Sequence, residues 1–299
     1  RWKEMHSYLR AIGFQSAKTR TDLEKLVGQI MENPTEKYKL AMKERISRVE
    51  LSKDFADRMG ITIRGEYDEK GFFHLESYFP YYRPEQINVK EEIFINKRVD
   101  TDAYTGMCDD VRLGVSLIFY LQNSLQYLEW QEKYDGMGRI VPASLCALSS
   151  GGMILLGTAP EVHDPIGSEW ELKRRTKLIM EARKGNQDAI DSLTIEDIDT
   201  FAMISRRAAK EDLYSLVETT FIPYGSESDN YSIVGTILGM RLVRNMYTNE
   251  EVYLLELDCN QVIFDVCINK NDLFGVPEVG RRFKGTIWMQ GRIDFSSDI

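Results

Sequence analysis

The residues with the clearest potential for chemistry are aspartates that crowd a short segment near residue 105. They are Asp100, Asp102, Asp109 and Asp110. Carboxylate oxygens are the ligands that Mg²⁺ and Ca²⁺ prefer. An EF-hand calcium loop counted from Asp100 is excluded, because its fifth, sixth and twelfth positions hold Tyr104, Thr105 and Val111. A looser metal site, and with it a metal-dependent enzyme, therefore stays open beside the alternative of a solvated acidic loop.

Motifs for nucleophilic catalysis or phosphate binding are not found in the chain. It lacks both the GxSxG elbow and the GxxxxGK[ST] loop. The histidines that could act as general bases are His6, His74 and His163. His74 alternates with Phe73 and Leu75, which is typical of an exposed residue on a half-buried strand. We therefore identify no catalytic residues, expect no cofactor and lean towards a protein that is not an enzyme.

Aromatic and basic residues in the last quarter of the chain raise a different chemistry, the binding of single-stranded nucleic acid. Such proteins stack bases on aromatic side chains along a basic groove. The candidate ligand-binding residues are Tyr247, Tyr253, Arg241, Arg244 and Trp288. Acidic residues outnumber basic ones between residues 226 and 299, however, and a small barrel needs the same aromatics to fill its interior. Nucleic acid is therefore a partner that the charge disfavours.

The composition sets limits on the compartment and the partners. The net charge of −9 disfavours long-range attraction to nucleic acids and acidic membranes, and 43% hydrophobic residues suffice for a sizeable core. No apolar run is long enough to span a bilayer, and no signal peptide is evident. The four cysteines form no CxxC pair, which favours reduced thiols over a zinc site. We expect a cytoplasmic protein with no membrane partner.

The periodicity of the first half predicts an antiparallel sheet with helices packed against it, residues 1–160. We expect helices over residues 21–31, with a capping box of Thr21 and Glu24, and over residues 36–44 and 124–134. Strands are expected around residues 46–51, 93–95 and 111–121, and hairpins from 61–67 with 73–79 and from 140–148 with 153–156. The aromatic and proline-rich stretch from Tyr78 to Pro84 is expected to be a loop that covers the sheet, with a ligand or partner surface as the alternative.

The rest of the chain predicts a helical connector followed by a second β module. Helices over residues 168–184 and 194–210 make a connector of residues 161–215. Residues 231–243, 252–257, 262–268 and 281–295 alternate as strands, and glycines inside them suit the corners of a small barrel. We predict an α+β protein with a small OB-like barrel at residues 216–299, and an open sandwich as the alternative.

Several stretches resemble a known family. They are the residues from Met5 to Phe14, Gly114 to Asn123, Ala202 to Arg207, and Arg282 to Gly291. In these stretches the chain is similar to a bacterial family called domain of unknown function 3881, and the similarity extends from Met5 to about Phe295. The resemblance implies a bacterial and cytoplasmic origin but no activity and no site residues.

These observations favour a non-enzymatic binding or adaptor protein whose partner is another protein. Two β modules without a recognisable catalytic constellation could each present a binding surface. A single-stranded nucleic-acid binder is the first alternative, and a metal-dependent enzyme that uses the segment from Asp100 to Asp110 is the second.

Overall fold

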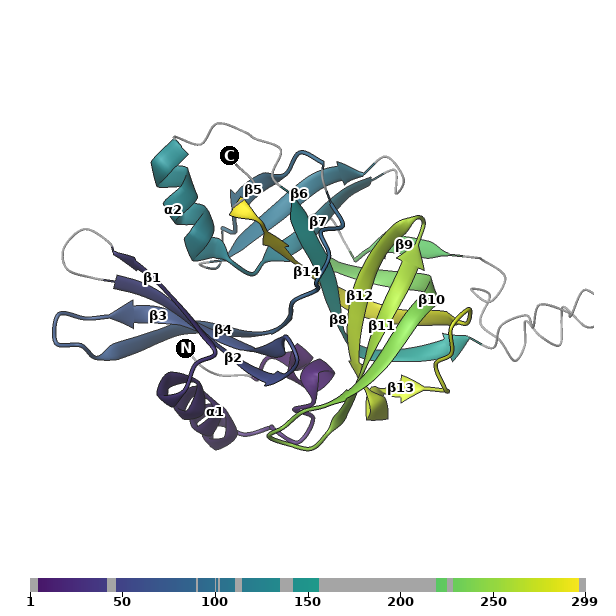
Figure 1. The fold of residues 1–299 in the computed structure, drawn as a ribbon, viewed down its shortest axis with the longest axis horizontal. Coiled ribbons are helices and arrows are strands. Elements are labelled where there is room, and N and C mark those ends of the chain that lie inside the picture. Colours follow the sequence, from purple (N-terminus) through teal and green to yellow (C-terminus); the bar gives the residue numbers. More distant parts are fainter. Residues whose placement is uncertain are drawn as a thin grey trace, which may run out of the picture. The chain divides into compact units, whose positions relative to one another are not determined.

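The computed structural model divides the chain into two compact units, one formed by Arg1–Ile154 with Thr219–Ile299 and the other by Leu155–Glu218. The structure describes residues 5–41, 47–89, 91–99, 101, 103–110, 115–134, 142–155, 219–224 and 228–295. The fold below is that of the first unit (Figure 1). Among the described residues, no helix is both long enough and apolar enough to cross a membrane.

The first sheet is a four-stranded antiparallel sheet with the strand order β1-β2-β3-β4. Its strands are β1 (Glu36–Ala41), β2 (Ser47–Ala56), β3 (Met59–Tyr67) and β4 (Phe73–Tyr82). The predicted hairpin is confirmed as β3 and β4. Its turn is held by Asp68, whose carboxylate accepts backbone hydrogen bonds from Lys70 and Phe72, and by Gly71 at φ 83°.

Two predictions in this sheet are wrong. Residues 36–41 form the edge strand β1 and not a helix, because pairing with β2 outweighs the helix propensity of their Glu and Lys residues. The stretch from Tyr78 to Tyr82 belongs to β4 and not to a loop, and both Tyr81 and Tyr82 are buried. Pro80 is tolerated there because β4 is the last strand of its sheet, where no neighbouring strand needs the missing N–H.

Helical segments cover the small sheet. The predicted helix near residue 21 is α1 (Arg20–Glu32), which packs on β2 and β3 through the expected apolar stripe of Leu23, Leu26 and Ile30. The capping box is formed by Thr19 and Asp22 and not by Thr21 and Glu24, so the helix begins slightly earlier than predicted. The short 3₁₀ helix η1 (Ser7–Ile12) contacts β4 and β12, and α2 (Ser124–Tyr134) confirms the helix predicted at residues 124–134.

The second sheet has ten strands and contains a closed barrel. Its order is β13-β8-β12-β11-β10-β14-β7-β6-β5, β9 pairs with β10, and an additional pairing joins β8 to β14. The five strands β8, β12, β11, β10 and β14 therefore close on themselves (Figure 1). The bounds are β5 Phe94–Lys97, β6 Tyr104–Asp110, β7 Val115–Leu121, β8 Ala143–Leu155, β9 Thr220–Pro223, β10 Asn230–Arg244, β11 Glu251–Cys259, β12 Val262–Asn269, β13 Leu273–Phe274 and β14 Arg282–Ile293.

The four long strands predicted in the C-terminal part are confirmed as β10, β11, β12 and β14. The strand that closes the barrel, β8, comes from the first half of the chain and pairs in parallel with β12. The predicted boundaries after residues 160 and 215, and the helical connector between them, lie outside the described residues and stay predictions. The described residues are mostly strand with few helices, which agrees with the α+β class in its coarse form.

The predicted hairpin of residues 140–148 and 153–156 is wrong, because β8 continues through the expected turn without interruption. Glycines at this place allow β8 and β14 to pack closely. A Cβ at Gly152 would overlap the ring of Phe283, and a Cβ at Gly285 would lie 2.9 Å from the carbonyl oxygen of Gly151. These glycines therefore let β8 and β14 approach each other and close the barrel.

A sealed polar contact joins the two sheets. Buried Arg64 on β3 donates to Glu50 at 2.7 Å and to the Tyr120 hydroxyl at 2.8 Å. The edge of β4 that faces away from β3 bonds to side-chain amides: Gln290 donates to the carbonyl of Pro80, and Gln122 donates to that of Tyr82. We call this set of residues the sealed contact, and it fixes β4 against the outside of the barrel.

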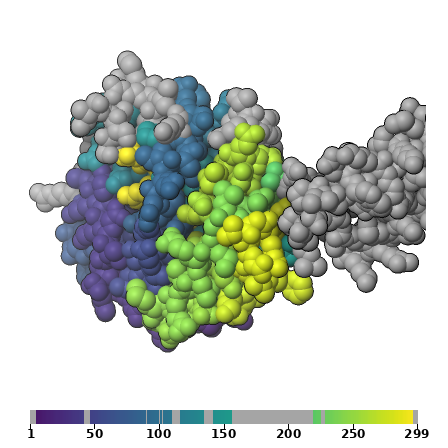
Figure 2. All heavy atoms as spheres, turned by 45° about the vertical axis from the view of Figure 1, so that its right-hand side comes forward, coloured from purple at the N-terminus to yellow at the C-terminus, as the bar shows by residue number. Residues whose placement is uncertain are grey.

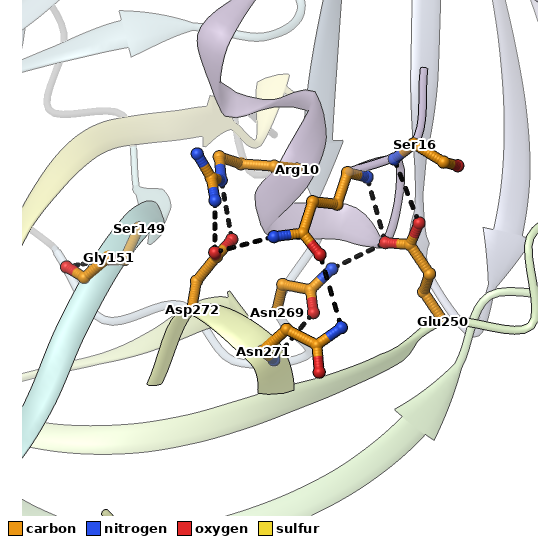
Figure 3. Close-up of polar contacts among 9 residues, drawn as sticks. Arg10, Ser16, Ser149, Gly151, Glu250, Asn269, Asn271 and Asp272 are labelled. Carbon is orange, nitrogen blue, oxygen red and sulfur yellow. Dashed lines mark hydrogen bonds and ion pairs between the residues drawn. The ribbon is translucent and has the colours of Figure 1, made fainter. Parts of the chain in front are cut away.

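A polar clasp holds the N-terminal segment to the turn between β10 and β11 (Figure 3). The carboxylate of Glu250 accepts hydrogen bonds from the backbone N–H groups of Gln15 and Ser16 and from the amide of Asn269. Arg10 forms an ion pair with Asp272 in η4 (Lys270–Asp272). Because these bonds fix one end of the β10–β11 hairpin, they also fix the barrel face that the hairpin carries.

Candidate functional site

An open groove of about 610 Å³ with a polar lining lies on the barrel surface. Its floor is the outer face of β10, β11 and β12, and its wall is the segment from Pro84 to Asn88 that follows β4. We call it the barrel groove. The side chains that define its chemistry are Tyr82, Arg241, Glu256 and Asp265, with Ile263 as an apolar neighbour.

Two carboxylates lie side by side on the floor of the barrel groove. Glu256 on β11 and Asp265 on β12 are direct partners in the strand register, so both side chains point to the same face. Like charges at opposing positions repel each other. Burial, and then the charge of Glu256, raise the pKa of Asp265, whereas the positive charge of Arg241 acts in the opposite direction. The floor therefore holds negative charge that the protein compensates only in part.

Arg241 and Tyr82 complete the polar floor. The Arg241 guanidinium donates to the Tyr82 hydroxyl at 3.2 Å, and that hydroxyl in turn forms a hydrogen bond with Asp265. Burial raises the pKa of Tyr82 above its usual value, so the hydroxyl stays protonated at neutral pH. Glu256 differs from Asp265, because the Glu256 side chain has no hydrogen-bond or ion-pair partner among the described residues.

The wall of the barrel groove is anchored by Asn88. Its amide donates to the carbonyl oxygens of Leu145 on β8 and Ile263 on β12, and its carbonyl accepts from the backbone of Leu145 at 2.7 Å. Further along the wall, Glu85 forms an ion pair with Arg58. The wall is therefore attached to the barrel at one end and to the β2–β3 turn at the other.

The ionisable side chains that line the barrel groove are carboxylates, a tyrosine and an arginine, with no histidine, cysteine or lysine among them. The lining carries three carboxylates against one guanidinium. Such a surface favours a ligand that brings positive charge and hydrogen-bond donors.

The sequence-predicted nucleic-acid residues are not brought together by the fold. Arg241 lies in the barrel groove, whereas Arg244 forms an ion pair with Glu251. Tyr247 packs against Phe14 and Phe55. Tyr253 lies half-buried beside the barrel core, and Trp288 is buried and donates its Nε1 proton to Asp229 at 2.9 Å. The described residues therefore show no row of exposed rings beside cations, and nucleic-acid binding stays a prediction.

The predicted metal segment is described only in part. Asp100 and Asp102 lie outside the described residues, as does the side chain of Asp110. Asp109 is exposed and accepts a hydrogen bond from Ser116 at 2.6 Å. Within the described part of the chain, no group of three or more His, Cys, Asp or Glu side chains is arranged to hold a metal ion. The metal site therefore stays a prediction.

The two described histidines lie in different surroundings. The ring of His6 packs against that of Trp288 at a tilt of 33°, with the centroids 4.8 Å apart, and burial lowers the pKa of His6 to about 4. His74 is exposed at the predicted hairpin and contacts Asp68 at 3.0 Å. His163 lies outside the described residues.

Sequence reasoning missed Tyr82, Glu256 and Asp265, although a signal for two of them was present. The strands predicted at residues 252–257 and 262–268 leave a short turn between them, and counting outward from Asn260 and Gln261 places Glu256 opposite Asp265. An acidic pair at opposing positions of a half-buried hairpin is unusual enough to mark a surface. No local signal could have placed Tyr82 beside them, because it arrives from another sheet.

Comparison with known proteins gives a family and no function. No curated protein and no solved structure matches the chain. A family model described as "Domain of unknown function, E. rectale Gene description (DUF3881)" matches residues 9–291, which is nearly the whole chain. The chain therefore belongs to the domain of unknown function 3881 family.

Proposed function

We propose that this protein is a non-enzymatic binding or adaptor protein and that it binds another protein through the barrel groove. The observation that carries the proposal is the free carboxylate of Glu256 beside Asp265 in an open groove of about 610 Å³. Buried or half-buried acidic groups are normally paired within the fold. A pair compensated only in part on a rigid barrel face is better explained by a partner that supplies further positive charge.

The proposed setting is the cytoplasm of a bacterium. All four cysteines are buried and unpaired, which fits a reducing compartment. We also propose that the barrel is of the OB type. This is supported by its five closed strands, in which β8 pairs in parallel with β12, while β12 with β11, β11 with β10 and β10 with β14 pair in antiparallel fashion.

The test compares the tagged full-length chain with two charge-reversed variants. Glu256→Lys changes the groove, and Glu24→Lys makes the same substitution at an exposed site on α1. Each protein is used for affinity purification from a bacterial lysate treated with nuclease. We expect a stoichiometric protein partner to be retained by the wild type and by Glu24→Lys, and to be lost with Glu256→Lys.

Two outcomes would count against the proposal. Retention of the same partner by Glu256→Lys would show that the groove is not the binding surface. Loss of every partner from the wild-type eluate on nuclease treatment would favour the nucleic-acid alternative.

A further inference from the structure

Part of β10 has a free edge. Residues 230–236 of β10 pair with β14, and residues 236–244 pair with β11 on the opposite side. The last bonds on the β14 side are made by Ile237, which donates to Arg281 and accepts from Gly280. Among the described residues, no strand pairs with residues 239–244 on that side. Backbone N–H and C=O groups along this edge are therefore available to another strand.

The free edge carries exposed apolar side chains beside two arginines, Arg241 and Arg244. Apolar side chains stand exposed along it, with Leu238 at 40%, Met240 at 44% and Leu242 at 47% exposure. The bulge between Ile237 and Gly239 lies at the beginning of the free part, and the register with β11 then runs unbroken from Gly239 to Arg244. Edges that are not used for binding are normally short, bulged or charged. This edge is regular over six residues.

The two faces of the free edge differ in chemistry. The register places Gly239, Glu256 and Asp265 in one row, so the face towards the barrel groove carries two carboxylates, with Arg241 two residues further along the same face. Met240 pairs with Leu255 and Leu242 with Tyr253, so the opposite face is apolar. A strand added beside β10 would therefore present alternate side chains to an acidic face and to an apolar face.

Gly239 forms a notch between the edge and the carboxylates. A Cβ at this position would lie 3.2 Å from Oε2 of Glu256, so the absence of a side chain leaves that carboxylate approachable from the edge. A long basic side chain on the neighbouring strand position can cross Gly239 and reach Glu256. Figure 2 shows the green and lime atoms of the β10–β11 hairpin at the molecular surface beside the blue atoms of the N-terminal half.

We propose that residues 239–244 of β10 bind an extended segment of a partner protein by β-strand addition, and that this segment alternates basic and apolar side chains. Its backbone pairs with the free edge, its basic side chains cross Gly239 to Glu256 and Asp265, and its apolar side chains cover Met240 and Leu242. The inference rests on the proposed function and adds the binding mode and the chemistry of the partner.

The test uses a fluorescein-labelled peptide of alternating lysine and valine, and a matched peptide with glutamate in place of lysine. Fluorescence anisotropy measures binding of each peptide to the wild-type protein, to Gly239→Val and to Glu256→Gln. We expect the lysine peptide to bind the wild type and the glutamate peptide not to bind. Each variant should weaken binding by about tenfold or more, which corresponds to the loss of one good contact. Thermal unfolding verifies that both variants are folded.

A second readout separates backbone pairing from simple charge attraction. Hydrogen–deuterium exchange at residues 239–244 should slow when the lysine peptide binds, because their free N–H groups become paired. A lysine peptide with N-methyl groups on alternate residues should fail to bind and to slow exchange. Equal binding of the N-methylated peptide, or unchanged exchange, would overturn the inference.

Failure of this inference is distinguishable from failure of the proposed function. If a lysate partner depends on Glu256 but does not slow exchange at residues 239–244, the groove binds protein and strand addition is wrong. If the wild type sediments as a dimer whose formation protects the same residues and excludes the peptide, the occupant is a second copy of the chain, and the stated partner is wrong.

Discussion

The sealed contact and the barrel groove are both polar, but they differ in whether their charged side chains have partners within the fold. In the sealed contact, buried Arg64 and Glu50 pair with each other, and Arg64 also bonds the Tyr120 hydroxyl and two backbone carbonyls. In the barrel groove, Glu256 has no such partner among the described residues, and the pKa of Asp265 is raised. The difference indicates which polar groups hold the fold together and which are available to a ligand.

The largest expected effect comes from breaking the sealed contact. Arg64→Ala leaves the Glu50 carboxylate buried without its partner, so we expect the free energy of unfolding to fall by about 3–5 kcal/mol. The matched change in the groove, Arg241→Ala, removes an exposed side chain and should cost about 1 kcal/mol or less. Urea unfolding monitored by circular dichroism measures the unfolding free energy of both variants. Equal losses for the two variants would remove the distinction between the two regions.

A smaller effect is expected from the glycines that close the barrel. Gly152→Ala places a methyl group against the ring of Phe283, so we expect a loss of about 1–3 kcal/mol in unfolding free energy. Gly151→Ala has no heavy atom within 4 Å of the new Cβ and serves as the control, with little change expected. Thermal unfolding by calorimetry compares them. A turn at residues 149–152, as the sequence indicates, would not separate the two variants in this way.

The smallest effect concerns the pH dependence of the barrel groove. Because the pKa of Asp265 is raised in the folded state, its ionisation opposes folding. This penalty is fully present above the folded pKa, shrinks as the pH falls through that pKa, and is absent below the unfolded value of about 3.9. Asp265→Asn should therefore stabilise the protein slightly at neutral pH and not near pH 4.

Urea unfolding of Asp265→Asn and the wild type across pH 4 to 8 measures this difference. In a Glu256→Gln background the stabilisation by Asp265→Asn should be smaller, because one source of repulsion has gone. A stabilisation that is independent of pH would contradict a raised pKa of Asp265 in the folded state.

Local patterns were sufficient for the elements that depend on neighbours in the chain. The alternation in residues 61–79 predicts the hairpin of β3 and β4, and the four C-terminal strands follow from the same period. Local sequence patterns predicted the wrong secondary structure where packing against residues distant in the chain determines it. Residues 36–41 have the charges of a helix but pair with β2, and Gly151 and Gly152 suggest a turn although they lie inside β8, where Gly152 packs against Phe283 of β14.

The sequence by itself determined the periodicity of most strands, the family and the scarcity of catalytic motifs, because each of these depends on residues close together in the chain. Tertiary structure alone decided that β8 closes the barrel in parallel with β12, that β4 seals its edge with Gln122 and Gln290, and that Tyr82 meets Asp265 in the barrel groove. These contacts join distant residues, whose pairing depends on the summed burial and hydrogen bonding of the whole unit.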